Sequence, residues 1–485
     1  MRSRFPLIII AALAALAALA VGLVAVAGAD DDTDLPPLTA AELLARVAAH
    51  DEGPQAISGD IVWKNRLFGE LPAFGDGAFA EATQSPLLRD GTGRLWAQGE
   101  QARFDAYTQA GDQVIVVDGA AGTAWVYDAV ENTARLFEVE GGLEGATAGA
   151  NGETESALGS PATGAPEPPT PERIADMLAV AARFMTVEVT GESVVAGQDA
   201  YLLTMTPAAT DTALGSIQAA IDGRTFVPLR VDVTARGAAE PTLSFGFERV
   251  SYAAVDDDVF AFSPPAGAEV ERQTIDPDGS GHGAKTDEGG TADEPGAGGE
   301  PNAGDDRSEG AEPSRDEVRL EARRALLDLE QAGALVDFEL RAAEGYTARA
   351  FRWAYVFDGG LPLDAAGAPL FGELMGAMGG GDAAGGSPPA TGAADSEAAG
   401  PAAVLLYGEG FGAIGLAETR TTPELREQLG ELPALFEPQP AGDSGARSLL
   451  TPLGGVVVWE EAGVTLVAFG IVPAQDLLEF VEALR

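Results

Sequence analysis

The chain has 485 residues, 46% of them hydrophobic, which is enough for about two or three domains with apolar cores. With 29 Lys and Arg against 76 Asp and Glu, the formal net charge is −47, which opposes binding to nucleic-acid phosphates, so no nucleic-acid partner is expected. The chain has no cysteine and only 2 histidines, which excludes disulfides, cysteine nucleophiles and cysteine zinc sites; we therefore expect no enzyme, no cofactor and no metal site.

Residues 1–29 have the pattern of an export signal. Two arginines precede an uncharged apolar run over 6–29, which ends in Ala27-Gly28-Ala29, and signal peptidase accepts small residues such as Ala27 and Ala29 at a cleavage site. The run is also long enough to remain in the membrane as an uncleaved anchor. Both alternatives place the rest of the chain outside the cytoplasm, secreted or in the cell envelope. Cleavage is the prediction, and it gives a mature chain that begins at Asp30.

Residues 38–272 form the first predicted domain. The pair Thr39 and Glu42 is a capping box, and the apolar spacing after it predicts a helix that ends near His50. A loop over 141–169 and a second predicted helix over 171–185 separate two groups of strands. Alternating apolar residues with turn residues about every ten positions predict an antiparallel meander. The predicted strands are 61–68, 94–99, 102–108, 113–119, 123–128, 134–140, 187–195, 200–207, 216–222, 228–235, 242–252 and 259–270.

An acidic segment separates this domain from a second one. Residues 273–313 carry eleven acidic residues, two basic residues and no aromatic residue, a composition that predicts a disordered linker. A capping box at Ser314 opens the smaller C-terminal domain, 314–485, with a helix to about Gln331, and a disordered insertion is predicted over 376–401. Its predicted strands are 348–357, 403–418, 455–461 and 464–472, and its last helix begins at Pro473.

Four stretches of the first domain carry patterns longer than a single element. They are VVDGAAGTAWVYDAVENTARLF (116–137), VVAGQDAYLLTMTP (194–207), IDGRTFVPLRVDV (221–233) and DDVFAFSPPAGAEV (257–270). In this order they resemble the LolA-like superfamily, with its LolA, LppX/LprG and RseB (MucB) types, and 454–473 resembles the small domain of RseB-type proteins. The resemblance implies an α+β fold: a curved, incomplete antiparallel β-barrel with helices covering its mouth, plus a smaller C-terminal α+β domain.

The resemblance also implies a function, that of a non-enzymatic extracytoplasmic carrier or sensor. Such a protein would hold the acyl chains of a lipid or lipoprotein in a hydrophobic half-barrel, with alternating strand residues forming the lining and a methionine-bearing helix serving as a lid. The predicted lining residues are Trp63, Leu95, Phe104, Trp125, Met177, Leu243, Phe245 and Phe247. Aromatic residues in this alternation are also typical of an ordinary packed core, and this alternative stays open.

Two other functions stay open as well. One is a regulatory module similar to RseB/MucB, in which both domains bind an anti-sigma factor or another membrane protein and the linker lets them close on it. The other is a structural envelope protein whose acidic surface serves only solubility. The sequence carries no nucleophile elbow, phosphate loop or helical zinc motif that would favour an enzyme.

Overall fold

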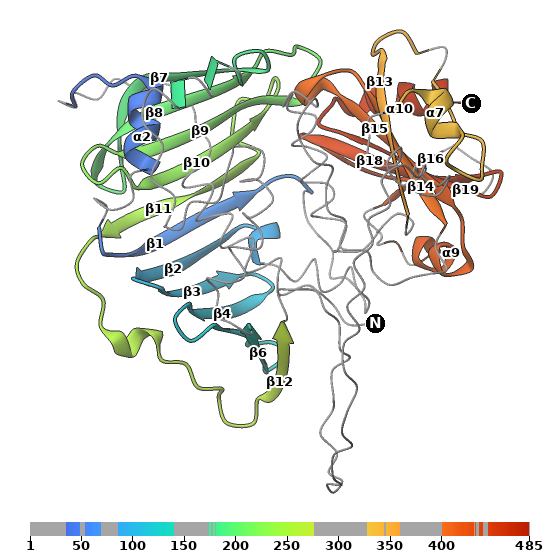
Figure 1. Cartoon of the computed structure of the whole chain (residues 1–485). Coiled ribbons are helices and arrows are strands. Elements are labelled where there is room, and N and C mark those ends of the chain that lie inside the picture. The colour runs from blue at the N-terminus through green and yellow to red at the C-terminus, as the bar shows by residue number, and fades with distance from the viewer. Residues whose placement is uncertain are drawn as a thin grey trace, which may run out of the picture.

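A computed structural model describes residues 35–48, 54–68, 86–139, 174–275, 327–358 and 400–484, with short gaps at 176–177, 180, 344–345, 431, 433–435 and 440–444. These residues form two β-sheets, each with helices of its own (Figure 1). The predicted signal at 1–29, most of the predicted linker and the capping box at Ser314 lie outside the described residues. Among the helices of the described ranges, none combines the length and the apolar character needed to cross a bilayer.

The larger sheet is open and has 12 strands. They are β1 (Ala56–Asn65), β2 (Gly91–Gln98), β3 (Gln101–Thr108), β4 (Gly111–Asp118), β5 (Thr123–Asp128), β6 (Thr133–Val139), β7 (Met185–Val195), β8 (Gln198–Pro207), β9 (Leu214–Asp222), β10 (Pro228–Ala235), β11 (Leu243–Ser251) and β12 (Glu269–Ile275). Their order is β12-β6-β5-β4-β3-β2-β1-β11-β10-β9-β8-β7, so β1 lies in the middle and β7 and β12 form the edges. Neighbouring strands pair antiparallel except β12, which runs parallel to β6.

The strands β1 to β11 confirm the predicted meander, whereas the predicted closing strand is wrong. Instead of one strand over 259–270, the chain forms the 3-10 helix η3 (Asp257–Phe260), and β12 begins only at Glu269. Pro264 and Pro265 have no N–H to donate to a ladder, which keeps the intervening residues out of the sheet. The helix predicted over 171–185 also extends too far, because Met185 already begins β7.

Two-residue turns close the hairpins β7–β8 and β18–β19. Ala196-Gly197 connects the first pair, with φ angles of 54° and 79°, and Ala462-Gly463 connects the second, with φ angles of 52° and 76°. Turns with two positive φ angles match the right-handed twist of strands, and glycine adopts this conformation without a steric penalty. The repeated Ala-Gly pair therefore fixes the register of both hairpins.

The helix α2 (Ala40–Ala48) confirms the first predicted helix and its cap. The Thr39 N–H donates to Glu42 Oε2 at 2.8 Å, and the Glu42 N–H donates to Thr39 Oγ1 at 3.2 Å, which is the reciprocal pattern of a capping box. The hydrogen bond from the Thr39 backbone lowers the pKa of Glu42. The helix buries Leu43 and Val47 against the β7–β9 end of the large sheet.

The smaller sheet has 7 strands in the order β13-β14-β15-β19-β18-β17-β16, and all of its neighbours pair antiparallel. The strands are β13 (Phe351–Asp358), β14 (Pro401–Tyr407), β15 (Ile414–Arg420), β16 (Glu437–Gln439), β17 (Ala446–Thr451), β18 (Gly454–Glu461) and β19 (Val464–Gly470). Its helices are α7 (Leu329–Gly333), α9 (Pro423–Gly430) and α10 (Ala474–Ala483), of which α10 confirms the predicted last helix.

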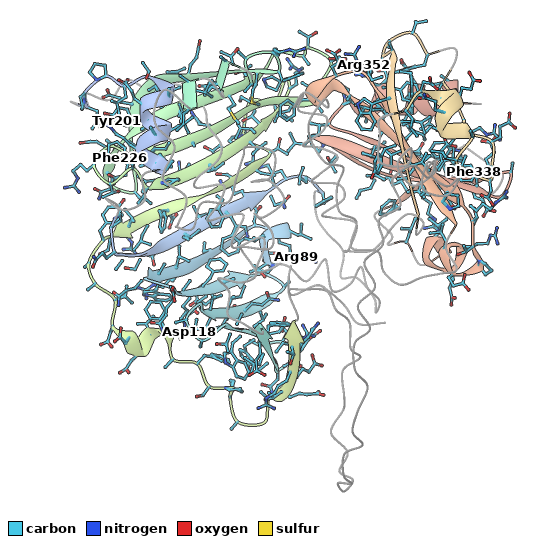
Figure 2. The ribbon with its side chains drawn as sticks, viewed as in Figure 1. Arg89, Asp118, Tyr201, Phe226, Phe338 and Arg352 are labelled. Carbon is cyan, nitrogen blue, oxygen red and sulfur yellow. The ribbon has the colours of Figure 1, made fainter. Side chains whose placement is uncertain are left out.

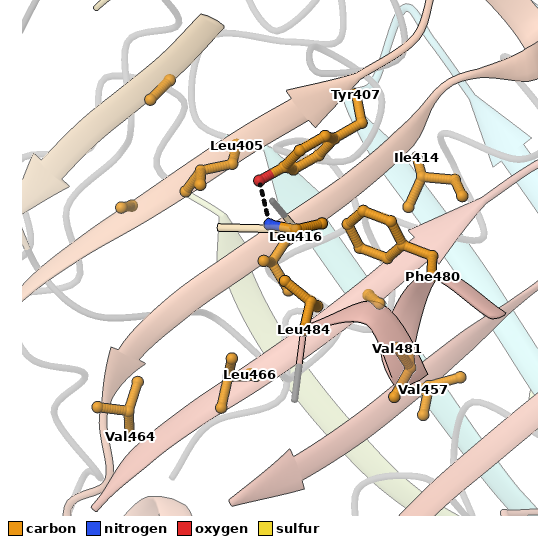
Figure 3. Packing of buried hydrophobic residues seen from close by; sticks show 14 of the residues in the cluster. Leu405, Tyr407, Ile414, Leu416, Val457, Val464, Leu466, Phe480, Val481 and Leu484 are labelled. Carbon is orange, nitrogen blue, oxygen red and sulfur yellow. Dashed lines mark hydrogen bonds between the residues drawn. The ribbon is translucent and has the colours of Figure 1, made fainter. Parts of the chain in front are cut away.

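One predicted strand of this sheet is in fact two. The stretch 403–418 divides into β14 and β15 around the 3-10 helix η4 (Gly410–Gly412), because Gly408 and Gly410 have positive φ angles of 87° and 55° that turn the chain back. The helix α10 then packs on the core face of β14, β15, β18 and β19, as Figure 3 shows for Phe480, Val481 and Leu484. The short strands β16 and β17 and the helix α9 were not predicted.

The described part of the chain is thus mostly β-sheet, with one large open sheet and a second, smaller one, in agreement with the coarse form of the predicted fold. A set of helices that covers a barrel mouth is not found within the described ranges. The predicted strand arrangement, antiparallel throughout, is corrected at β12.

Candidate functional site

One face of the large sheet is apolar across most of its width. Residues paired directly across neighbouring strands point to the same face, so the register identifies the members of each row. The first row consists of Trp63, Phe245, Val231, Ala219, Leu203 and Val189, on β1, β11, β10, β9, β8 and β7. Every member is apolar, and we call this surface the apolar face.

The apolar face continues through β2 to β5. Its second row consists of Leu95, Phe104, Ile115 and Val126. Leu95 is paired with Gly59, which lies on the same side of β1 as Trp63 because the two are four residues apart in a strand. The two rows therefore belong to one face that extends from β5 to β7.

Trp63 lies near the centre of the apolar face and is 2% exposed. Its ring packs against the rings of Phe104 and Phe245, with centroid distances of 5.6 and 6.4 Å. Gly91 permits this packing, because a Cβ atom there would overlap the indole ring. The indole Nε1 donates to the Pro86 carbonyl oxygen at 3.0 Å, so the 3-10 helix η2 (Pro86–Leu88) covers this part of the face.

The other end of the apolar face is covered by α2. Figure 2 shows Tyr201 and Phe226 beside this helix, and both belong to the cluster that includes Leu43 and Val47. The Tyr201 hydroxyl donates to the Pro36 carbonyl oxygen at 2.7 Å, and burial raises the pKa of Tyr201, so the hydroxyl keeps its proton. The chain before α2 is thereby fixed to the sheet.

Most of the predicted lining residues that the structure describes lie on the apolar face. Trp63, Leu95, Phe104 and Phe245 belong to its two rows, as described above. Leu243 and Phe247 alternate with Phe245 on β11, and Phe247 is paired with Ile61, so they share its face. Met177 lies outside the described residues.

Trp125 lies on the opposite face of the sheet. It is paired with Val116 and Leu136, and its ring packs against Phe262 at 5.5 Å between centroids. The segment after η3 therefore covers that face of β5, so β5 carries apolar residues on both sides. Both alternating sets of side chains in β5 include apolar residues, so alternation alone cannot tell which set lies on the apolar face. This explains why Trp125 was predicted and Val126 was missed.

Sequence reasoning also missed Ile115, Val189, Leu203 and Val231. Val189 and Val231 alternate with polar residues, as in a half-buried strand, whereas Ile115 and Leu203 stand in runs of consecutive apolar residues, 114–117 and 200–203. A period of two cannot choose a face in such a run. Cross-strand register supplies that choice, and it is available only in three dimensions.

A buried arginine joins the two sheets. Arg349 is 4% exposed, and its Nη2 donates to the Asp211 carbonyl oxygen at 2.9 Å and to Asp476 Oδ2 at 2.8 Å. Beside it, the Thr212 hydroxyl and the Ala213 N–H both donate to the Ile471 carbonyl oxygen at 2.8 Å. The loop between β8 and β9 is thus bonded to residues next to β19 and α10.

A buried carboxyl lies in the core of the smaller sheet. Glu418 is 0% exposed, and the Arg341 N–H donates to both of its oxygens, at 3.2 and 3.0 Å. Burial raises the pKa of Glu418 to about 8, and the hydrogen bonds from Arg341 oppose this shift. The side chain stands between Ala403 and Leu466 of the neighbouring strands, away from the apolar face of the large sheet.

No family model matches the sequence, and no curated protein matches it. The chain is similar in structure to a chain of the Pseudomonas aeruginosa MucA/MucB complex, with a TM-score of 0.36, 14% identity, and coverage of 91% of this chain and 96% of that chain. A crystal structure of MucB is similar with a TM-score of 0.31 and 14% identity, and the match covers 92% of this chain and 96% of that chain. A LolA superfamily protein from Nitrosomonas europaea is similar with a TM-score of 0.18 and 11% identity, and the match covers 47% of this chain and 99% of that chain.

The resemblance expected from the sequence is thus confirmed, in that the similar solved structures include MucB and LolA superfamily proteins. Because these TM-scores and identities are low, they carry no inference about ligand or partner.

Proposed function

We propose that the apolar face of the large sheet binds the acyl chains of a lipid or lipoprotein, and that the protein is a non-enzymatic carrier or sensor outside the cytoplasm. The observation that carries the proposal is the two apolar rows of this face, the first of which contains Trp63, because together they cross ten of the strands without a charged member. A hydrophobic ligand needs such a surface because burial of its methylene groups is the source of affinity.

The dimensions of the apolar face suit one acyl chain. Six neighbouring strands at a spacing of about 4.8 Å extend over about 24 Å, whereas an acyl chain spans about 15 Å, half of a bilayer's hydrocarbon core. Each methylene removed from water contributes about 0.8 kcal/mol, so burial of ten methylenes supplies about 8 kcal/mol. Burial alone is therefore sufficient for a stable complex.

The 3-10 helix η2 covers Trp63, and the ligand would enter where this helix lies. η2 is held by the indole bond to Pro86 and by Asn65, whose Nδ2 donates to the Leu87 carbonyl oxygen at 3.0 Å. A few hydrogen bonds of this kind, each with a net contribution of about 1 kcal/mol, are weaker than the burial of an acyl chain. Binding of the ligand would displace η2 from the indole ring.

Two measurements test the proposal. Native mass spectrometry of the protein purified without detergent should show co-purified lipid. A brominated fatty acid should quench Trp63, so Trp63→Phe should lose most of the quenching, whereas Trp125→Phe on the opposite face should retain it. Absence of both bound lipid and quenching would refute acyl-chain binding, and equal quenching in the two variants would refute the assignment to this face.

A second candidate is a regulatory module that binds an anti-sigma factor or another membrane protein with both sheets. It is favoured by the Arg349 contact, which holds the two sheets as one surface. In this case Arg349→Met should abolish capture of the partner by cross-linking in native envelopes, while lipid binding persists. Unchanged capture in Arg349→Met would exclude this candidate.

We also infer an extracytoplasmic location, because residues 1–29 have the pattern of an export signal. The apolar run and its cleavage pattern predict a mature chain that begins at Asp30. Intact mass of the protein recovered from its native envelope measures the N-terminus. A chain that retains Met1 in the membrane fraction would instead support the uncleaved anchor.

A further inference from the structure

A hollow lies on the face of the large sheet opposite the apolar face. Val62 and Lys64 of β1 alternate with Ile61 and Trp63, so they point to the other side. The hollow has a volume of about 290 Å³. Its lining residues are Val62, Lys64, Arg66, Arg230, Asp232, Glu240, Pro241 and Ser244.

The register of three strands builds the floor of this hollow. Lys64, Ser244 and Asp232 form one row across β1, β11 and β10. In the adjacent row, Gly246 stands beside Arg230, and a Cβ atom at Gly246 would lie 2.8 Å from the Arg230 Cβ. The missing side chain at Gly246 therefore leaves room for the stem of Arg230 over β11.

The rim of the hollow is fixed by the loop between β10 and β11. The Arg66 N–H donates to the Thr242 carbonyl oxygen at 2.8 Å, and the Arg66 guanidinium forms an ion pair with Glu240. These bonds connect the end of β1 to the loop that carries Pro241. The hollow is thus formed before any ligand arrives, which lowers the ordering cost of binding.

Two cations of the hollow form no ion pair with a residue that the structure describes. Within the described residues, no carboxylate forms an ion pair with Lys64 or Arg230, whereas Arg66 is paired with Glu240. On the same face, Arg94 and Arg103 are paired with Asp60 and Asp105 at 3.2 and 2.8 Å. Asp232 is 9% exposed and accepts the Ser244 hydroxyl at 2.5 Å. In a chain with a net charge of −47, two neighbouring cations without an ion pair in the described ranges are a local exception.

We propose that this hollow binds acidic side chains of a partner peptide, with one carboxylate at Lys64 and another at Arg230. Each carboxylate carries a single charge, which suits two separate monovalent cations better than a phosphate dianion does beside the buried Asp232. Val62 and Pro241 supply apolar contacts for the methylenes of glutamate. At 0.15 M salt, charges more than about 8 Å away are screened, so the rest of the acidic surface does not prevent binding.

The test is fluorescence anisotropy of a labelled hexaglutamate peptide with the full mature chain at 0.15 M salt. Lys64→Gln should raise Kd by roughly fivefold, which corresponds to about 1 kcal/mol. Arg94→Gln is the matched control, because Arg94 lies on the same face and is already paired with Asp60. Its Kd should stay within twofold of the wild type.

Several results would overturn the proposal. Equal loss of affinity in Lys64→Gln and Arg94→Gln would show non-specific attraction, and no binding of hexaglutamate would remove the site. Binding of inorganic phosphate or of phosphatidylglycerol vesicles, but not of hexaglutamate, would assign the hollow to a different ligand. Lys64→Gln should keep the far-ultraviolet circular dichroism of the wild type, which shows that the variant is folded. Quenching of Trp63 by the brominated fatty acid should also be unchanged in Lys64→Gln, so the two proposals can fail separately.

Discussion

The two sheets of this protein differ in how many of their faces are buried. In the smaller sheet, β19 is buried at every residue from Val464 to Gly470, because α7 and α10 pack on one face and a second apolar cluster lies on the other. In the larger sheet, β1 has the buried Trp63 on one side and the exposed Lys64 on the other. A sheet buried on both faces has no surface for a ligand, so the smaller sheet serves stability and the larger sheet is the one suited to binding.

The largest effect is expected from Phe480→Ala in the core of the smaller sheet. Phe480 is 0% exposed, and its ring packs edge-on against Tyr346 and Tyr407 at centroid distances of 5.2 and 4.9 Å. Loss of the ring leaves a cavity, so the free energy of unfolding of this sheet should fall by about 4 kcal/mol. Chemical denaturation followed by tryptophan fluorescence measures the change.

The matched substitution on the apolar face is Leu95→Ala. Leu95 is only partly buried, so its truncation should lower the free energy of unfolding by about 2 kcal/mol. In a titration with a fatty acid, Leu95→Ala should bind the ligand with lower affinity than the wild type. Phe480→Ala should bind it with the affinity of the wild type. If both substitutions destabilised the protein equally and neither changed ligand binding, the apolar face would be an ordinary core and the contrast between the sheets would fail.

The next effect depends on pH and concerns Glu418. Its pKa rises from 4.5 to about 8 on folding, so the folded state binds the proton more tightly than the unfolded state. This contribution to stability is complete below pH 4.5 and is lost as the pH rises through 8, with a loss of about 3 kcal/mol by pH 7. Glu418→Gln should remove this pH dependence and raise the free energy of unfolding at pH 7.

Urea denaturation between pH 4.5 and pH 8.5 measures this effect. Glu437→Gln is the control, because Glu437 is exposed on β16, and it should retain the slope of the wild type. A variant at Glu418 with the wild-type slope would show that this carboxyl is ionised in the folded protein. In that case Glu418 would not have a raised pKa, and the stability of the smaller sheet would not depend on its protonation.

The smallest effect is expected at the cap of α2, which covers the apolar face. Thr39→Ala removes the hydroxyl that accepts the Glu42 N–H, and the loss of such a cap should speed amide exchange in α2 by about fivefold. Thr39→Ser keeps the hydroxyl and should restore protection. Exchange of β19 should not change in either variant, and a parallel increase there would mean that the two sheets do not open separately.

Much of the fold could be predicted because its signals are local. The strands β1 to β11, the capping box of α2 and the helix α10 follow from alternation, turn residues, a capping pattern and apolar spacing within a few positions. The parallel strand β12 could not be predicted in this way, because its partner residues on β6 stand 136 residues earlier and no local rule selects them. The 403–418 stretch failed for a different reason, because its glycines turn the chain in a run that is otherwise apolar.

The site was predictable only in part, and the limit is again one of register. Phe104 and Phe245 stand between polar or glycine residues, so alternation assigns them a face, whereas Trp63 directly follows Ile61 and Val62. Trp125 and Val126 are adjacent and both apolar, so the sequence offers two faces for one strand. No sequence signal brings Lys64 and Arg230 together, because both line the hollow from strands that are distant in the chain.

The position of β1 governs the order in which the large sheet can assemble. β1 stands between β2, which follows closely in the chain, and β11, whose Arg249 bonds to Asp60 across 189 residues. The hairpins β2–β6 and β7–β11 are local and form early, whereas the seam between them closes only after β11 has been synthesised. Trp63 and Phe245 lie on opposite sides of that seam. A chain interrupted before residue 243 would therefore consist of two half-sheets with unpaired central edges, prone to aggregation and without a continuous apolar face.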